Sequence, residues 1–170
     1  RRAERTARFP VTYQAYHEPV VGGGAVFFHL NPDVGTINDL NERLTTFYEV
    51  VRDYPDQLIA ENKTHEYAEE YFYQAREKFN RALSQSTVTR EGRIQEASLL
   101  LYLNRTCFNG LYRENSDGEF NVPFGRHTNP DWVQGQWIRQ ASQSRHGADG
   151  FTHEFDCVGE GEHQGDLVAL

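Results

Sequence analysis

The chain has 170 residues and a formal net charge of −8, with 38% hydrophobic and 25% charged residues. This length suits one domain, or one domain with an inserted subdomain, and it is long enough to bury a core. The acidic balance argues against binding to nucleic acid through a broad basic face. No apolar run approaches the roughly 20 residues that span a bilayer, and no signal segment opens the chain, so a cytoplasmic location is expected.

The first third of the chain is typical of a parallel α/β unit, because strand, glycine turn, helix and strand follow one another in that order. Three glycines interrupt an otherwise apolar stretch, and an acid ends the second strand. A helix is expected from Asn41, where apolar residues recur at helical spacing. The predicted elements before it are a strand at 13–17, a turn at 22–24, a helix starting within 25–30 and a strand at 36–40.

The middle of the chain has a helical pattern from about residue 55 to residue 103. Between residues 104 and 125 the composition changes to asparagine, glycine, arginine and aromatic residues, which favours a loop or hairpin. Residues 119–125 alternate like an edge strand. After this stretch we expect a helix at 131–145, a strand at 150–155 and a last strand at 166–170.

Lysine and cysteine are both scarce. Lys63 and Lys78 are the only lysines, whereas acidic residues are abundant, a composition that suits a high-salt environment in which a few local arginines still bind nucleic acid. An acidic protein with no such partner remains the alternative. Cys107 and Cys157 lie far apart without metal-ligand spacing, so we expect free thiols and no metal site.

The glycine turn and the acids around it indicate a ligand site. In a parallel α/β unit, the carboxyl end of the first strand faces the start of the next helix, where free N–H groups attract anionic groups. Glu18 and Gly22 to Gly24 fall there, and Asp39 falls where an acid can accept both ribose hydroxyls. A nucleoside-bearing ligand fits this pattern of glycines and acids together. The glycines taken alone favour a structural tight turn over a ligand site. The Lys-Ser/Thr of a P-loop is absent, which argues against nucleotide hydrolysis.

A second informative stretch runs from Leu103 to Asn115 and reads LNRTCFNGLYREN. An arginine such as Arg113 can read guanine with two hydrogen bonds, and an asparagine such as Asn109 can bond a base edge or a phosphate. Apolar side chains such as Phe108 or Leu111 can wedge between stacked bases. Composition alone favours a surface loop anchored by aromatic residues.

Five motifs resemble those of a known family in their residues and in their order along the chain. They are HEPVVGGGAVFFHL, INDLN, YFYQAREKFN, LYLNRTCFNGLYRENSDGEFNVPFG and the closing GDLVAL. Together they resemble the Dam-type (D12 class) DNA adenine N6-methyltransferases over nearly the whole chain. The resemblance implies an α/β fold of the Rossmann-like methyltransferase type, S-adenosylmethionine as cofactor and double-stranded DNA as partner.

By this resemblance, the cofactor residues lie at the sheet and the DNA-binding residues in an insert. Residues 1–54 and 146–170 would form a partial methyltransferase core, and 55–145 an inserted target-recognition subdomain with helices and a hairpin. The cofactor would contact Glu18, Pro19, Gly22, Gly23, Gly24, Asp39 and either Glu154 or Asp156. DNA would contact Arg105, Phe108, Asn109, Leu111, Arg113, Asn115 and Pro123. Tyr73, Arg76, Phe79 and Asn80 also match the family, and we expect a structural role for them.

The family's catalytic tetrapeptide, Asp-Pro-Pro-Tyr, does not occur in these 170 residues. An adenine methyltransferase needs such a group to accept hydrogen bonds from the flipped amino group and to stack the ring. The opening Lys-Trp-Ala-Gly-Gly-Lys segment of the family is also missing. We therefore expect an incomplete methyltransferase fold, an internal portion of an enzyme that is inactive by itself. The alternatives are a non-catalytic DNA-binding module and a degenerate remnant, and the target sequence and biological role stay open.

Overall fold

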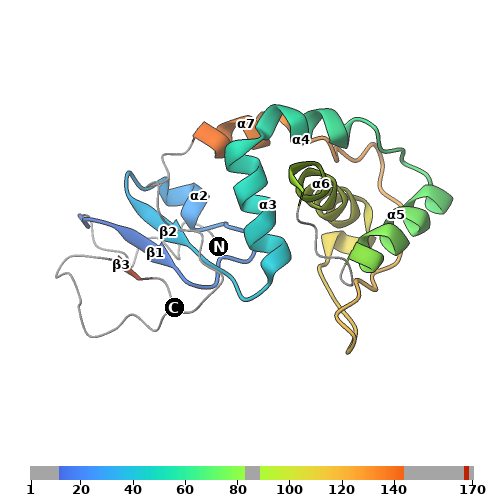
Figure 1. The fold of residues 1–170 in the computed structure, drawn as a ribbon, viewed down its shortest axis with the longest axis horizontal. Coiled ribbons are helices and arrows are strands. Elements are labelled where there is room, and N and C mark those ends of the chain that lie inside the picture. Colours follow the sequence, from blue (N-terminus) through green and yellow to red (C-terminus); the bar gives the residue numbers. More distant parts are fainter. Residues whose placement is uncertain (1–11, 83–88, 144–166, 169–170) are drawn as a thin grey trace. The chain divides into compact units, whose positions relative to one another are not determined.

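The protein is a mixed α/β structure, here a computed structural model that describes residues 12–82, 89–143 and 167–168. The chain divides into two compact units, one made of Arg1–Thr45 with Gln140–Leu170 and the other of Thr46–Arg139. The first unit contains the sheet, and the second is built from helices and the loops between them (Figure 1).

Among the described residues of the first unit, three short parallel strands form a sheet. They are β1 (Tyr16–Glu18), β2 (Gly35–Ile37) and β3 (Leu167–Val168), and β1 lies between the other two (Figure 1). The predicted parallel arrangement of the first two strands is confirmed. The strands differ from the predicted ranges by one to three residues, so Asp39 lies beyond the end of β2.

The connection from β1 to β2 contains the glycine turn and the short helix α2 (Phe27–Leu30). This helix starts at Phe27, within the predicted range of 25–30, and its C-cap is Asn31, whose φ of 45° lies in the left-handed region that asparagine tolerates. Gly35 follows because a Cβ there would lie 2.6 Å from the backbone oxygen of Tyr16 on the neighbouring strand. The buried Phe27 packs against Tyr16 and covers β1.

Helices account for most of the second unit. α4 begins at a proline, which suits the first turn because its missing N–H has no helical partner there. α6 begins after Thr89, whose side chain accepts a hydrogen bond from the backbone N–H of Gly92 at 3.1 Å. The helices that follow β2 in the chain are α3 (Glu42–Asp53), α4 (Pro55–Asn62), α5 (Glu69–Arg81), α6 (Arg90–Thr106) and α7 (Gly135–Gln143), with a 3-10 turn η2 (Phe108–Gly110).

The core of the second unit lies around α6, which packs against α4 and α5. Its residues 97–103 are all buried, in agreement with the apolar stripe in the sequence. Phe72 and Phe79 of α5 are fully buried, and Phe79 meets Phe120 edge to face. Burying each such aromatic side chain stabilises the fold by about 1.5–3 kcal/mol. No helix in the described ranges is long and apolar enough to cross a membrane.

The expected edge strand at 119–125 is not present. Two isolated antiparallel bridges, Glu114 with Phe120 and Cys107 with Phe124, hold this stretch as an irregular hairpin. We call residues 107–125 the recognition hairpin, after the role that the family resemblance implies for this segment. A regular strand does not form because side chains of α5 bond its backbone and because Pro123 has no N–H to donate.

The helix expected at 131–145 begins four residues later, at Gly135. Asp131 causes this delay, since its Oδ1 accepts hydrogen bonds from the backbone N–H groups of Val133 and Gln134, both at 3.1 Å. Gln134 also has a φ of 50°, which is incompatible with a helix. The strand expected at 150–155 lies outside the described residues, as do Arg145 and the ends of the last predicted strand.

Candidate functional site

The glycine turn and Asp39 meet at the carboxyl end of the first unit's sheet. Asp39 is 9% exposed, and its Oδ2 accepts a hydrogen bond from the backbone N–H of Gly22 at 2.9 Å. Its Oδ1 accepts a second one from Asn41 at 3.0 Å. The backbone oxygen of Asn38 binds the N–H of Val21 at 2.8 Å, so the turn is held against the end of β2. The two sequence features predicted to share a site therefore lie in direct contact.

The three glycines of this turn differ in what requires them. Gly22 and Gly24 have φ angles of 49° and 65°, where side chains are strained. Gly23 has no such angle, and a Cβ built on it would meet no described atom within 4 Å. Neither the backbone nor the packing among the described residues explains a glycine at position 23, so the space beside it is available to a ligand.

Glu18 ends β1 beneath this turn and is almost fully buried. Its Oε2 accepts hydrogen bonds from the hydroxyl of Tyr16 at 3.0 Å and from the backbone N–H of Phe27 at 3.1 Å. Burial raises the pKa of Glu18, and the two hydrogen bonds oppose that rise. Part of its role is thus to anchor the start of α2, which leaves the other carboxylate oxygen for further contacts.

Tyr16 is the residue that sequence analysis missed at this site. Its ring is completely buried, and burial together with the charge of Glu18 raises the pKa of its hydroxyl. The signal was present in the sequence, because residues two apart on a strand point to the same face. Of the other predicted cofactor residues, Pro19 follows β1 beside the exposed Val20, whereas Glu154 and Asp156 lie outside the described residues.

The recognition hairpin of the second unit presents several apolar side chains to solvent. Phe108 is 52% exposed and Leu111 is 47% exposed, which is unusual for side chains of this size. Pro123 is also exposed, and its backbone oxygen accepts a hydrogen bond from the N–H of Phe108 at 2.9 Å. Phe108 and Pro123 thus lie side by side, and the structure brings together two residues that were predicted to contact DNA.

Arg113 and Asn115 occupy defined positions on the same hairpin. The Nε of Arg113 donates a hydrogen bond to Oδ1 of Asn121 at 2.8 Å, which fixes the direction of an exposed guanidinium. Asn115 forms the hairpin's turn, since its Oδ1 accepts hydrogen bonds from the backbone N–H groups of Asp117 and Glu119. Asn115 therefore has a structural task in addition to the DNA contact predicted for it.

A polar pocket of about 750 Å³ lies at the base of the recognition hairpin. Two predicted DNA-binding residues, Arg105 and Asn109, are part of its wall. Arg105 donates a hydrogen bond to Oε1 of Gln134 at 2.7 Å, and Asn109 has a left-handed φ of 55°. The pocket is lined by Asn104, Arg105, Asn109, Gly110, His127, Thr128, Pro130, Asp131 and Gln134.

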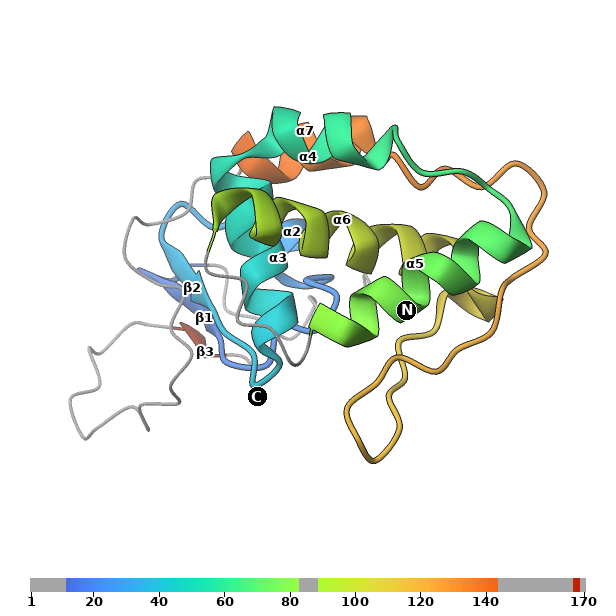
Figure 2. The same cartoon turned by 45° about the vertical axis from the view of Figure 1, so that its right-hand side comes forward.

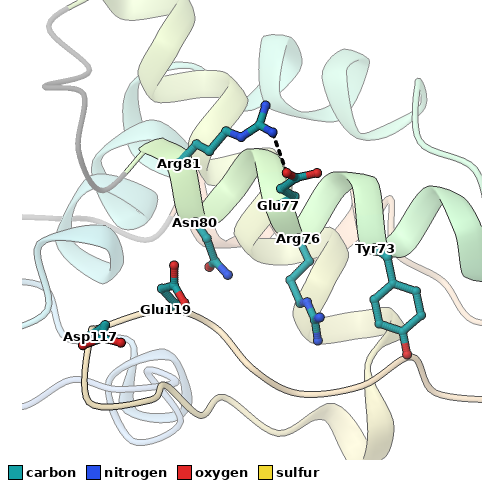
Figure 3. A pocket seen from close by; sticks show the side chains of 7 residues that line it. All are labelled: Tyr73, Arg76, Glu77, Asn80, Arg81, Asp117 and Glu119. Carbon is teal, nitrogen blue, oxygen red and sulfur yellow. Dashed lines mark hydrogen bonds and ion pairs between the residues drawn. The ribbon is translucent and has the colours of Figure 1, made fainter.

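Side chains of α5 also bond the hairpin, and Figure 3 shows Arg76 and Asn80 among them. Arg76 donates to the backbone oxygen of Val122 at 3.3 Å. Asn80 bonds both backbone groups of Phe120, donating at 3.1 Å and accepting at 2.9 Å. These bonds agree with the structural role expected for the α5 residues. They line a second polar pocket, of about 680 Å³, with Tyr73, Glu77, Arg81, Asp117 and Glu119.

Two further residues of the hairpin's base, Tyr67 and His127, were not found from the sequence. The hydroxyl of Tyr67 bonds the backbone of Gly125 and of His127, which lie 58 and 60 residues further along the chain. His127 bonds the backbone oxygen of Cys107 at 2.8 Å. Contacts at such separations leave no local pattern. Cys107 itself is a buried free thiol, as predicted, and burial raises its pKa to about 11, whereas Cys157 lies outside the described residues.

Comparisons with known proteins agree with the resemblance described above. The sequence profile of the D12 class N6 adenine-specific DNA methyltransferases matches residues 6–168. The chain is 37% identical over 136 residues to a type II methyltransferase, M1.LlaDCHI, of Lactococcus lactis subsp. cremoris. The matched region covers 79% of this chain and 46% of that protein.

Two other relatives extend over more of the chain. The type II methyltransferase M.MjaIII of Methanocaldococcus jannaschii is 34% identical over 158 residues, covering 85% of this chain and 53% of that protein. A DNA adenine methylase of Serratia marcescens is 36% identical over 157 residues, covering 89% of this chain and 51% of that protein. The chain thus spans about half the length of these curated relatives. It belongs to the D12 class of N6 adenine-specific DNA methyltransferases.

Proposed function

We propose that this chain is the cofactor-binding and target-recognition part of a DNA methyltransferase that transfers a methyl group from S-adenosylmethionine to adenine N6 in duplex DNA. The family to which it belongs and the names of its relatives support this reaction. S-adenosylmethionine supplies an electrophilic methyl group. The residues described here bind and orient the reactants, since the 170 residues contain no Asp-Pro-Pro-Tyr to hold the target amino group.

The observation that carries the cofactor part of this proposal is the open space at Gly23. A glycine that neither its φ nor its described neighbours require is best explained by a ligand that approaches the backbone closely. Asp39 lies within hydrogen-bond distance of the same turn, where a carboxylate can also accept ribose hydroxyls. We infer that the methionine part of the cofactor lies against Gly22 to Gly24 and that its ribose lies at Asp39.

The DNA part of the proposal rests on the recognition hairpin. Phe108, Leu111 and Pro123 are apolar and exposed, which is the form of side chain that enters between base steps. Arg113, which follows Leu111 by two residues, is also exposed, and its guanidinium can make two hydrogen bonds to guanine. We infer that the hairpin inserts into the target site and that Arg105 and Asn109 contact DNA at the pocket at its base.

The two compact units fit a division of labour between these roles. The unit that contains the sheet would bind the cofactor as part of a Rossmann-like methyltransferase core, and the helical unit would be the inserted target-recognition subdomain. The boundaries near residues 45 and 140 support this assignment without identifying the ligand of either unit.

Calorimetric titration of S-adenosylmethionine into the purified chain tests the cofactor role. We expect the Gly23→Ala variant to melt at the wild-type temperature and to bind the cofactor at least about tenfold more weakly, because its Cβ would take up the ligand's space. Ala25→Ser is the matched control, since it adds one atom at an exposed position of the same turn. Wild-type affinity in Gly23→Ala would contradict the proposed contact.

Cofactor binding, and not methyl transfer, separates this proposal from its alternative, a DNA-binding module outside methyl-transfer chemistry. Both hypotheses predict no methyl transfer by these 170 residues, which contain no Asp-Pro-Pro-Tyr. We expect the chain to bind S-adenosylmethionine and DNA without transferring labelled methyl groups. A chain that binds DNA selectively but not the cofactor would support the alternative.

A further inference from the structure

The hydroxyl of Tyr67 is a fixed point for the recognition hairpin. We propose that Tyr67 is a positioning residue that sets the direction of this hairpin and thereby the selectivity with which the chain binds duplex DNA. This inference rests on the proposed function, because it assumes that the hairpin is the DNA-reading element.

Tyr67 lies in the loop between α4 and α5 and reaches the chain directly after the hairpin. Its hydroxyl donates a hydrogen bond to the backbone oxygen of Gly125 at 2.6 Å and accepts one from the backbone N–H of His127, also at 2.6 Å. The backbone oxygen of His127 is a second acceptor, 3.2 Å away. One hydroxyl group therefore fixes the backbone at two positions, Gly125 and His127, directly after the hairpin ends.

The residues that Tyr67 holds are the ones that close the base of the hairpin. His127 Nε2 donates to the backbone oxygen of Cys107 at 2.8 Å, because a carbonyl can only accept. The N–H of Gly125 donates to the backbone oxygen of Thr106 at 2.8 Å. The first residue of the hairpin is thus tied to the segment that Tyr67 anchors, so a shift of that segment moves both ends of the hairpin together.

Close packing at Gly125 makes this anchor sensitive to small movements. A Cβ at this position would lie 2.5 Å from the backbone oxygen of Cys107 and 2.4 Å from Nε2 of His127. The two chain segments at the hairpin base, at Cys107 and at Gly125, therefore approach each other as closely as glycine allows. Such an arrangement transmits a displacement of Gly125 directly to Cys107 and to the adjacent Phe108.

The ring of Tyr67 rests on a rigid platform. It is stacked on Trp132, with 6.0 Å between the ring centroids, and it lies 5.0 Å from the ring of Phe124. The indole N–H of Trp132 donates to the backbone oxygen of Asn62 at 3.1 Å, and the side-chain amide of Asn62 donates to the backbone oxygen of Val133. Because Asn62 ends α4, the tyrosine connects the hairpin to the helical core.

The proposal assigns Tyr67 no contact with DNA. Its hydroxyl is occupied by backbone groups of its own chain, and its ring is half-buried between Trp132 and Phe124. Its effect on binding must pass through the wedge residue Phe108 and through Arg113, which the hairpin carries. A loss of the hydroxyl should therefore change selectivity more than it changes overall affinity.

The test compares Tyr67→Phe with Tyr71→Phe. Both variants remove one phenolic hydroxyl from the same unit, but the hydroxyl of Tyr71 binds Nδ1 of His65 and not the hairpin. Hydrogen exchange is measured at the backbone N–H groups of Phe108 and Gly125, which bond the backbone oxygens of Pro123 and Thr106. Amides in the middle of α6 are the internal standard. The second measurement is the ratio of affinities for a duplex selected from a random pool and for its scrambled form.

In Tyr67→Phe we expect exchange at Phe108 and Gly125 to be about 5- to 100-fold faster, which is the effect of losing the two hydrogen bonds of the hydroxyl, to Gly125 and from His127. We expect the affinity ratio to fall by a similar factor. Tyr71→Phe should change neither quantity, although its melting temperature falls. Equal effects of the two variants, or unchanged exchange in Tyr67→Phe, would overturn the proposal. If the wild-type chain selects no duplex, the proposed DNA function fails, and exchange at the hairpin alone decides whether Tyr67 positions it.

Discussion

The backbone N–H of Gly22 donates a hydrogen bond to Oδ2 of Asp39 across 2.9 Å, joining two segments that lie 17 residues apart in the chain. The same carboxylate accepts a second backbone hydrogen bond from Asn41. Because a carboxylate has about four acceptor positions, two remain for a ligand after the turn is fixed. Asp39 therefore serves the shape of the glycine turn and keeps acceptor positions for the proposed cofactor.

Substitution of Asp39 should weaken cofactor binding through both of these tasks. In Asp39→Asn, the amide group can accept from only one side, so the N–H of either Gly22 or Asn41 loses its acceptor, and one acceptor for the proposed ribose is lost with it. We expect S-adenosylmethionine to bind about 10- to 100-fold more weakly, which corresponds to the loss of one or two hydrogen bonds to a charged group. Titration calorimetry measures this, with the exposed Asp33→Asn as control. Equal affinities of the two variants would contradict a ribose contact.

Arg113 should determine sequence preference rather than general affinity. Replacement by alanine should cost about 1–3 kcal/mol on a duplex selected from a random pool, because two hydrogen bonds to a base are lost. Arg113→Lys keeps the charge but loses the planar fork, so it should bind the selected and scrambled duplexes more equally. Fluorescence anisotropy at fixed salt measures both. Arg90→Ala, which removes an exposed arginine paired with Glu91, is the control, and a comparable loss there would argue for non-specific charge attraction.

A methyl group at Gly125 should destabilise the second unit. The added Cβ would meet the backbone of Cys107 at 2.5 Å, and backbone cannot move aside as a flexible side chain can. We expect Gly125→Ala to lower the free energy of unfolding by about 1–3 kcal/mol. Urea denaturation measures the change. Gly23→Ala is the matched control because its Cβ meets no described atom, and we expect it to stay within about 0.5 kcal/mol of the wild type.

His65 should make stability depend on pH in the acidic range. It is buried, with Nδ1 bonded to the hydroxyl of Tyr71 and Nε2 to the hydroxyl of Ser98. Burial, with a smaller contribution from the charge of Lys78, lowers its pKa from 6.5 to about 4. Between these two values the unfolded chain binds a proton that the folded chain does not. Stability is therefore complete above pH 6.5 and falls as the pH decreases towards 4.

The expected loss from this group is about 2–3 kcal/mol between pH 7 and pH 4. Urea denaturation at several pH values should show it in the wild type, on top of the contribution of the carboxyl groups. In His65→Gln the difference should disappear, so the curve should be flatter than that of the wild type, while His29→Gln on the exposed surface should follow the wild type. Parallel curves for wild type and His65→Gln would show that His65 is not the group that titrates.

Local patterns in the sequence predicted the sheet and most helices. Gly22 to Gly24 between two strands indicated the α/β connection, and Pro55 marked the start of a helix correctly. The predicted start of α7 was wrong. Asp131 bonds the backbone N–H groups of the two residues that precede the helix, and apolar periodicity contains no information about such bonds. Periodicity also could not show that Asn80 would take the place of a strand partner for Phe120.

The candidate site was predictable where its residues are close in sequence or follow a strand. Asp39 and the glycine turn were found because strand ends in a parallel sheet meet at one edge. Tyr67 and His127 were not found, because their contacts depend on how α4, α5 and the hairpin pack together. The exposure of Phe108 and Leu111 is likewise a property of the folded chain, since apolar residues in sequence ordinarily predict burial.

The two hydrogen bonds between Asn80 and the backbone of Phe120 limit how the recognition hairpin can be transplanted. Figure 2 shows the course of the hairpin and α5, and Figure 3 shows the side chain of Asn80. An isolated peptide of residues 107–125 has two bridges and no continuous ladder, so it lacks the means to hold this conformation in water. A chimera that exchanges only this loop between family members would leave its backbone groups without their partners. The unit of exchange is the loop together with α5, whose Arg76 and Asn80 belong to the same functional element.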